Sequence, residues 1–119
     1  MTIKISLPLR VISKKNNRMS AGRFTIASPA YRAFELTALQ YIKYQSDWNG
    51  VTVGEHVKLD MTLNLKGKIH QDIDNALTSI LDTLQKARVI VDDDQVREAV
   101  VRKTNGNKDF SCDIIIENY

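Results

Sequence analysis

The sequence predicts an α+β fold in a single domain, with two main helices and a mostly antiparallel or mixed sheet. Several short segments alternate apolar and polar residues, which is the pattern of half-buried strands. Two other segments carry apolar residues at helical spacing. The chain has 119 residues, of which 43% are hydrophobic and 26% charged. One domain over residues 1–119 can therefore bury a core of its own.

The N-terminal segment predicts a strand, a loop and a second short strand. Apolar residues alternate at 3–7, and Pro8 ends that pattern. Residues 13–23 contain almost no apolar side chain, so we expect a basic loop there. Residues 24–26 are apolar or β-branched and predict a short strand.

The middle of the chain predicts a helix followed by a strand. Ser28 is a suitable N-cap and Pro29 suits the first helical position, so we expect a helix over residues 29–47. Residues 57–65 alternate cleanly, which predicts a strand with one buried face. The Lys-Gly-Lys segment at 66–68 ends it.

The C-terminal part predicts a second helix and two further strands. Apolar residues at helical spacing indicate an amphipathic helix over 75–87. Residues 95–101 run into a strand, and residues 110–116 form a returning one. Asn105-Gly106 lies between them and is a strong signal for a hairpin turn.

Charge is unevenly distributed along a chain whose net charge is +3. Residues 71–98 hold seven acidic residues against three basic ones. Residues 1–34 hold no acidic residue and seven basic ones: Lys4, Arg10, Lys14, Lys15, Arg18, Arg23 and Arg32. Basic surfaces attract phosphate-rich partners. The alternative for this basic half is an ordinary solvated surface.

Other features restrict the class of protein. No apolar run approaches the roughly 20 residues that cross a bilayer, so we expect no membrane partner. The one cysteine, Cys112, excludes an intrachain disulfide framework and a multi-cysteine zinc site, which favours a cytoplasmic location. Cys112 alternates with Ile114 and is expected in the core. His56 and His70 have no partner at a metal-ligand spacing and are expected to be structural or exposed.

The informative acidic residues are Asp72 and Asp74. On an extended segment, residues two apart share one face. We therefore expect this pair in extended chain just before the second helix, with Asp74 near its N-cap and Ile73 turned inward.

A third acidic residue can reach this pair. The predicted helix rises about 20 Å, and an extended stretch from Ala87 to Asp93, including residues 88–91, covers about the same distance. If that stretch runs back along the helix, Asp93 arrives beside Asp72 and Asp74. Three carboxylates suit Mg²⁺ or Mn²⁺, and carboxylate-held Mg²⁺ beside phosphate is usual for phosphodiester cleavage.

Two other interpretations of these acids compete with the metal site. A calcium loop of the EF-hand type needs a ligand at Ala76 and a glycine at Leu77, so it is excluded. The other alternative stays open: Asp74 caps a helix, and residues 92–94 form a solvated turn.

The acidic motifs resemble those of the RusA family of Holliday-junction resolvases. Residues 72–75 (Asp-Ile-Asp-Asn), then a helix, then residues 91–96 (Val-Asp-Asp-Asp-Gln-Val) are similar to the family pattern. Residues 7–8, 16–18 and 28–32 resemble the family's opening strand, asparagine-containing loop and first helix. The resemblance spans nearly the whole chain in the right order.

The resemblance implies a small homodimer, bacterial or phage-encoded, that binds four-way DNA junctions and nicks two strands symmetrically with Mg²⁺, for which Mn²⁺ can substitute. Carried over by position, the catalytic and metal-binding residues are Asp72, Asp74 and Asp93. The residues expected to contact DNA phosphates are Arg10, Lys14, Lys15, Asn17, Arg18 and Arg23.

Two positions depart from the family pattern. Thr78 stands where the family has a lysine, and Gln71 stands where it has an arginine. Candidates to supply the missing charge from elsewhere are Lys15, Lys68 and Lys103. These departures motivate one alternative, a branched-DNA-binding protein with weak or lost nuclease activity. Another is a structural domain whose acidic patch binds a partner protein.

Overall fold

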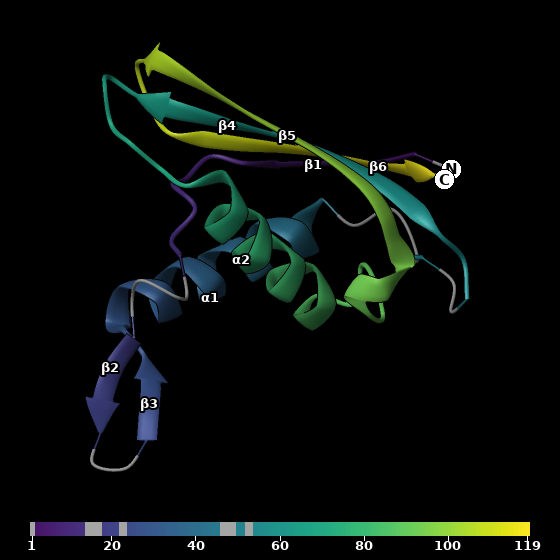
Figure 1. Ribbon diagram of the computed structural model, residues 1–119, viewed down its shortest axis with the longest axis horizontal. Helices are drawn as coiled ribbons and strands as arrows, with labels where there is room; N and C mark the ends of the chain where they lie inside the picture. Colours follow the sequence, from purple (N-terminus) through teal and green to yellow (C-terminus); the bar gives the residue numbers. More distant parts are fainter. Residues whose placement is uncertain (1, 14–17, 22–23, 46–49, 52–53) are drawn as a thin grey trace.

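A four-stranded mixed sheet carries two helices on one face (Figure 1). The computed structural model describes residues 2–13, 18–21, 24–45, 50–51 and 54–119. The elements in chain order are β1 (Thr2–Leu7), β2 (Arg18–Ala21), β3 (Phe24–Ala27), α1 (Pro29–Tyr44), β4 (Val57–Lys66), α2 (Ile73–Lys86), the 3₁₀ turn η1 (Asp93–Gln95), β5 (Val96–Asn107) and β6 (Ser111–Asn118). The predicted α+β class, with a mixed sheet and two main helices, is confirmed.

The strands of the main sheet lie in the order β1-β6-β4-β5. β6 is antiparallel to both β1 and β4, whereas β4 and β5 are parallel. Because β4 separates β5 from β6, the predicted Asn105-Gly106 hairpin is wrong. The positive φ of Gly106 (78°) instead accommodates an extra residue in β5, between the pairs Asn64↔Thr104 and Lys66↔Asn107.

The core lies between the sheet and the helices. The apolar positions of β1, β4 and β6 point toward α1 and α2, as their alternation predicts. α1 begins where predicted, with the Ser28 hydroxyl accepting from the Tyr31 backbone N–H at 3.1 Å. It ends at Tyr44, before the predicted residue 47, and residues 46–49 lie outside the described residues. The Gln45 amide then ties this helix end to the Ser6 backbone by two 2.8 Å hydrogen bonds.

The predicted loop over residues 13–23 was wrong for residues 18–21, which form β2 and pair antiparallel with β3. The strand expected at 24–26 is confirmed as β3. Backbone pairing in a two-stranded ribbon needs no apolar alternation, which is why the sequence pattern missed β2. Figure 1 shows this ribbon beside the start of α1 and away from the four-stranded sheet.

The chain after α2 does not extend as predicted. Arg88 adopts a left-handed conformation (φ 60°), and the Val89 backbone N–H bonds back to the Leu84 carbonyl at 2.9 Å. Val89 and Ile90 are buried in the core. Their β-branched side chains favour extended structure, which is why the sequence predicts a strand here. In the fold, they pack in the core next to the C-terminal end of α2.

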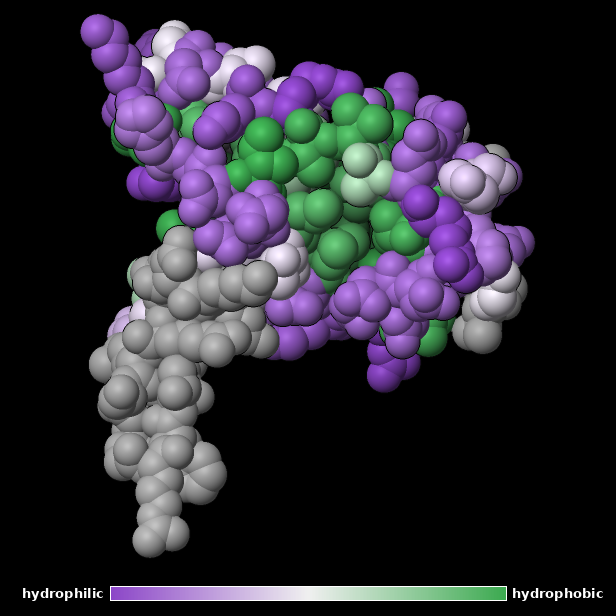
Figure 2. Space-filling model, in the orientation of Figure 1, coloured by the Kyte–Doolittle hydropathy of each residue, from purple (hydrophilic) through white to green (hydrophobic). Residues whose placement is uncertain are grey.

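An apolar surface lies between α2 and β5. Ile73, Leu77 and Leu81 follow one another at four-residue spacing on α2; Ile73 is exposed, and the other two are half-buried. Ala99 and Val101 pair with Leu59 and Met61 of β4, whose side chains face the helices, so they lie on the same side of the sheet. Figure 2 shows this region as a continuous hydrophobic area ringed by hydrophilic residues. We call these five residues of α2 and β5 the α2–β5 apolar face.

Candidate functional site

Asp72 and Asp74 lie at the N-terminal end of α2. Asp72 is the N-cap residue, but its side chain makes no capping bond and instead accepts from the Asn75 amide at 3.2 Å. Asp74 lies in the first turn, and both acids are exposed. A helix N-terminus stabilises carboxylates through its dipole. These two carboxylates are therefore available to bind a cation.

The local structure of this pair differs from the prediction. The helix begins at Ile73 and not at residue 75, so Asp74 is helical and only Asp72 is extended. Ile73, expected to turn inward, is 36% exposed. The reason is that the apolar spacing of α2 extends back to Ile73, which starts the stripe continued by Leu77.

The segment that leads into Asp72 is fastened to β5 at alternate carbonyls. The Lys103 ammonium donates to the Gln71 carbonyl at 3.0 Å, and the Asn105 amide donates to the Ile69 carbonyl at 3.0 Å. The Gly106 backbone N–H donates to the Gly67 carbonyl at 2.7 Å. These bonds fix the backbone immediately before Asp72.

A cavity of about 420 Å³ opens beside Asp72. Its polar lining comes from the N-terminal segment and from the start of α2: Arg10, Ser13, His70, Gln71, Asp72 and Asn75. The Arg10 guanidinium also lies over the Phe110 ring, 5.2 Å from its centroid. The cavity thus combines a cation with one of the predicted metal-binding acids.

The positions of two residues in this cavity had no signal in the sequence. His70 is exposed, as one of the two expectations had it, and it lies in the cavity wall. The Gln71 amide nitrogen donates to the Val11 carbonyl at 2.6 Å, and its Oε1 is buried with no hydrogen-bond partner in the described part of the chain. Because these contacts join segments 60 residues apart, spacing could not have revealed them.

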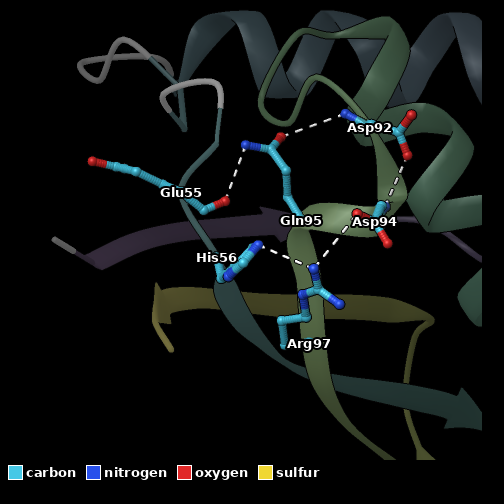
Figure 3. Close-up of polar contacts among 6 residues, drawn as sticks. All are labelled: Glu55, His56, Asp92, Asp94, Gln95 and Arg97. Atoms are coloured by element: carbon cyan, nitrogen blue, oxygen red, sulfur yellow. Dashed lines mark hydrogen bonds and ion pairs between the residues drawn. The ribbon is translucent and has the colours of Figure 1, made fainter.

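Asp93 lies on η1, next to the C-terminal end of α2. The turn is capped by Asp92, whose carboxylate accepts from the Asp94 backbone N–H at 2.9 Å. The buried Gln95 side chain accepts from the Val91 N–H at 2.7 Å and donates to the Glu55 carbonyl at 3.3 Å. Figure 3 shows how Gln95 links the turn to the segment before β4.

The three adjacent acids of this turn have different partners. Arg97 lies between His56 and Asp94, at 3.1 Å from the His56 Nε2 and 3.6 Å from the Asp94 carboxylate (Figure 3). The Asp94 N–H lowers the pKa of Asp92, whereas a hydrogen bond with Asp92 raises the pKa of Asp93. Asp92 therefore caps this exposed turn and Asp94 pairs with Arg97, as the solvated-turn alternative has it, whereas Asp93 has a hydrogen bond with Asp92.

The predicted return of Asp93 to Asp72 and Asp74 does not occur within one chain. The left-handed turn at Arg88 and the burial of residues 89–90 keep η1 at the far end of α2. The 14 residues of α2 span about 20 Å. Within the residues that the structure describes, no three His, Cys, Asp or Glu side chains gather closely enough to hold a metal ion.

Comparison with known families decides which proteins this chain resembles. A family model described as Endodeoxyribonuclease RusA matches residues 8–117, nearly the whole of the chain. The chain belongs to the RusA family. This membership implies an endodeoxyribonuclease that acts on Holliday junctions. No curated protein matches the sequence.

The RusA match covers both acidic segments and the basic N-terminal segment. Of the predicted DNA-binding residues, Arg10 is exposed in the cavity wall beside Asp72, and Arg18 begins β2. Lys14, Lys15, Asn17 and Arg23 lie outside the described residues. In the part of the RusA chain that is described, neither helix has the length and hydrophobicity needed to span a membrane.

Proposed function

We propose that this RusA-family chain, over residues 1–119, is a Mg²⁺-dependent, structure-selective endonuclease that resolves four-way DNA junctions by paired nicking. It would act in the bacterial cytoplasm, encoded either by the bacterium or by a phage that infects it. The observation that carries the proposal is the pair of exposed carboxylates at the start of α2. Asp72 occupies the N-cap position without capping the helix. Its carboxylate is therefore available for a ligand, beside a cavity that also contains Arg10.

The chemistry of the acids fits a hard cation. Mg²⁺ and its substitute Mn²⁺ prefer carboxylate oxygens. Asp72, Asp74 and Asp93 are exposed and form no ion pair with another described residue, whereas Asp60 and Asp94 are paired with arginines. A metal ion held by these acids would supply an activated water and would neutralise charge at the scissile phosphate.

A homodimer explains how acids at opposite ends of α2 can act together. Packing the α2–β5 apolar face on its own copy about a two-fold axis, with the two α2 helices antiparallel, brings each N-terminal end near the other subunit's C-terminal end. Asp72 and Asp74 then meet the partner's Asp93. Exposed apolar patches of this kind commonly mark protein interfaces. The two identical sites of such a dimer suit paired cuts in two strands.

The DNA-binding surface is proposed to be the basic N-terminal segment. Arg10 is held against Phe110 and lines the cavity beside Asp72. The other residues proposed to contact backbone phosphates follow Arg10 in the sequence: Lys14, Lys15, Asn17, Arg18 and Arg23. Such contacts position DNA without reading its sequence, which suits an enzyme selective for junction shape.

The test is nicking of a synthetic four-way junction by the Asp72→Asn variant in Mg²⁺. We expect nicking to be abolished and junction binding to be preserved or improved, because one negative charge facing the phosphate is removed. The matched control is Asp109→Asn, which makes the same change in the exposed turn between β5 and β6. Full cleavage by Asp72→Asn would exclude the proposed metal site.

The same assay decides the alternative, a branched-DNA-binding protein with weak or lost nuclease activity. One observation favours it. The Thr78 hydroxyl donates to the Asp74 carbonyl at 3.0 Å, so the position where RusA proteins carry a lysine holds no charge. A wild-type chain that binds junctions and does not nick them in Mg²⁺ or Mn²⁺ would support this alternative.

A further inference from the structure

We propose that Lys103 is the residue that contributes positive charge at the Asp72 site and contacts the phosphate that is cut. The inference rests on the proposed nuclease function. Its starting point is the 3.0 Å hydrogen bond from the Lys103 ammonium to the carbonyl of Gln71, the residue immediately before Asp72. This bond places a cation next to the start of α2.

The strand register explains why Lys103 reaches this point. Lys103 pairs with Leu63 of β4, whose side chain is buried beneath the helices. Side chains of paired neighbours lie on the same side of a sheet. Lys103 is therefore on the helix side of β5, two residues beyond Val101, at the end of the sheet where α2 begins.

The neighbouring cations of β5 are occupied elsewhere. Arg102 alternates to the opposite side of the sheet and forms a two-pronged contact with the Asp60 carboxylate. Arg97 lies between His56 and Asp94. Lys103 forms no ion pair with any residue that the structure describes, so its charge is available to a bound anion.

The ammonium group is suited to hold a phosphate while remaining fastened. It carries three N–H donors, of which the Gln71 carbonyl takes one. The other two can donate to a non-bridging phosphate oxygen. Fixing the long side chain in advance lowers the entropic cost of that contact, and a preorganised donor stabilises the charge that develops during cleavage.

The test compares Lys103→Met, Lys103→Arg and wild type on one four-way junction. Methionine keeps an unbranched side chain of similar reach and removes the charge. The matched control is Lys58→Met, on the opposite side of the sheet, where Lys58 pairs with Glu117 at 3.7 Å. We expect Lys103→Met to slow single-turnover nicking about 100-fold, and Lys103→Arg to retain most of the rate. Lys58→Met should match wild type.

Two further measurements, one without Mg²⁺ and one with it, distinguish a role of the Lys103 charge from a purely structural role. In EDTA, the dependence of junction affinity on salt should lose about one unit of slope in Lys103→Met if the ammonium contacts one phosphate. In Mg²⁺ titrations of nicking, Lys103→Met should need no more Mg²⁺ than wild type, because removing a cation does not weaken a cation site. A purely structural role for Lys103 predicts the opposite: the salt slope would be unchanged, and Lys103→Met would need more Mg²⁺ than wild type, since Asp72 would move.

The outcomes distinguish this inference from the function it rests on. A wild type that nicks, together with Lys103→Met that nicks at the same rate, overturns the Lys103 assignment alone. A wild type that does not nick overturns the nuclease proposal, and the salt slope in EDTA then decides whether Lys103 contacts phosphate. Thermal unfolding of Lys103→Met checks that the exposed substitution leaves the fold intact.

Discussion

Activity should be restored when two inactive variants of this RusA protein are combined in one dimer. Asp72→Asn and Asp93→Asn are each expected to be inactive alone. If Asp72 of one subunit acts with the partner's Asp93, a mixed dimer has one site carrying both substitutions and one site carrying neither. The intact site should nick.

The structure sets the size of this effect. α2 separates Asp72 from Asp93 by about 20 Å along its axis, whereas Mg²⁺ binds oxygen at about 2.1 Å, so one chain cannot supply both ligands to one ion. After free subunit exchange, about half of the dimers are mixed and the solution holds about a quarter of the wild-type number of sites. Each mixed dimer has one working site and can cut only one strand per binding event. The main product should therefore be a singly nicked junction, and the pair of resolved duplexes should be the minor product.

The assay uses two affinity tags to isolate the mixed dimer and a junction labelled on each strand in turn. The matched control mixes Asp72→Asn with Asp74→Asn. These acids lie at the same end of one helix, so every site in that mixture lacks one ligand and no activity should return. Mixed dimers of Asp72→Asn and Asp93→Asn that bind junctions but stay as inactive as their parents would refute assembly of the site between subunits.

Three further outcomes follow from the described contacts. Thr78→Lys should not speed single-turnover nicking, because Lys103 already provides the cation and a second one crowds it; a clear gain would count against the Lys103 assignment. Burial raises the pKa of the Cys112 thiol to about 12, so native protein should resist a thiol reagent at pH 8 and react fully only after unfolding in denaturant. The hydrogen bond from Arg102 lowers the pKa of the Asp60 carboxyl group in the folded protein. This contact therefore stabilises the fold at pH values above the unfolded-state pKa of Asp60, and the stabilisation is lost as the pH falls through the lower folded-state pKa. Because the Asp60 pair is exposed, Asp60→Asn should cost less than about 1 kcal/mol in denaturant unfolding at pH 7, and the difference from wild type should vanish in acid.

The parts of the fold that the sequence predicts are those that local rules determine. The alternation over residues 57–65 describes β4 because one face of that strand is buried along its whole length. Ser28 and Pro29 mark the start of α1 because capping involves only the adjacent turn. Tertiary context decided the failures. Asn105-Gly106 has turn chemistry, yet the positive φ of the glycine serves a bulge in a strand that continues to Asn107.

In the candidate site, too, the sequence predicts the local features and misses those that depend on tertiary contacts. Residue type and spacing single out Asp72, Asp74 and Asp93, and the RusA family match covers all three positions. Their arrangement depends on the left-handed turn at Arg88, which residue patterns do not specify. Spacing also could not show that Lys103, 32 residues later in the chain, would reach the Gln71 carbonyl. Sequence patterns therefore supplied the chemistry of the site and not its geometry.

The hydrogen bonds of Gln71 also bear on when this region becomes ordered during folding. Its amide contacts Val11, 60 residues earlier, and its carbonyl contacts Lys103, 32 residues later. Contacts between distant parts of a chain form late, because the intervening segments must first be ordered. The surroundings of Asp72 are therefore complete only when β5 is in place beside β4. A chain still emerging from the ribosome can already contain the acidic residues of α2, but the Lys103 contact with the Gln71 carbonyl can form only after residue 103 has been added.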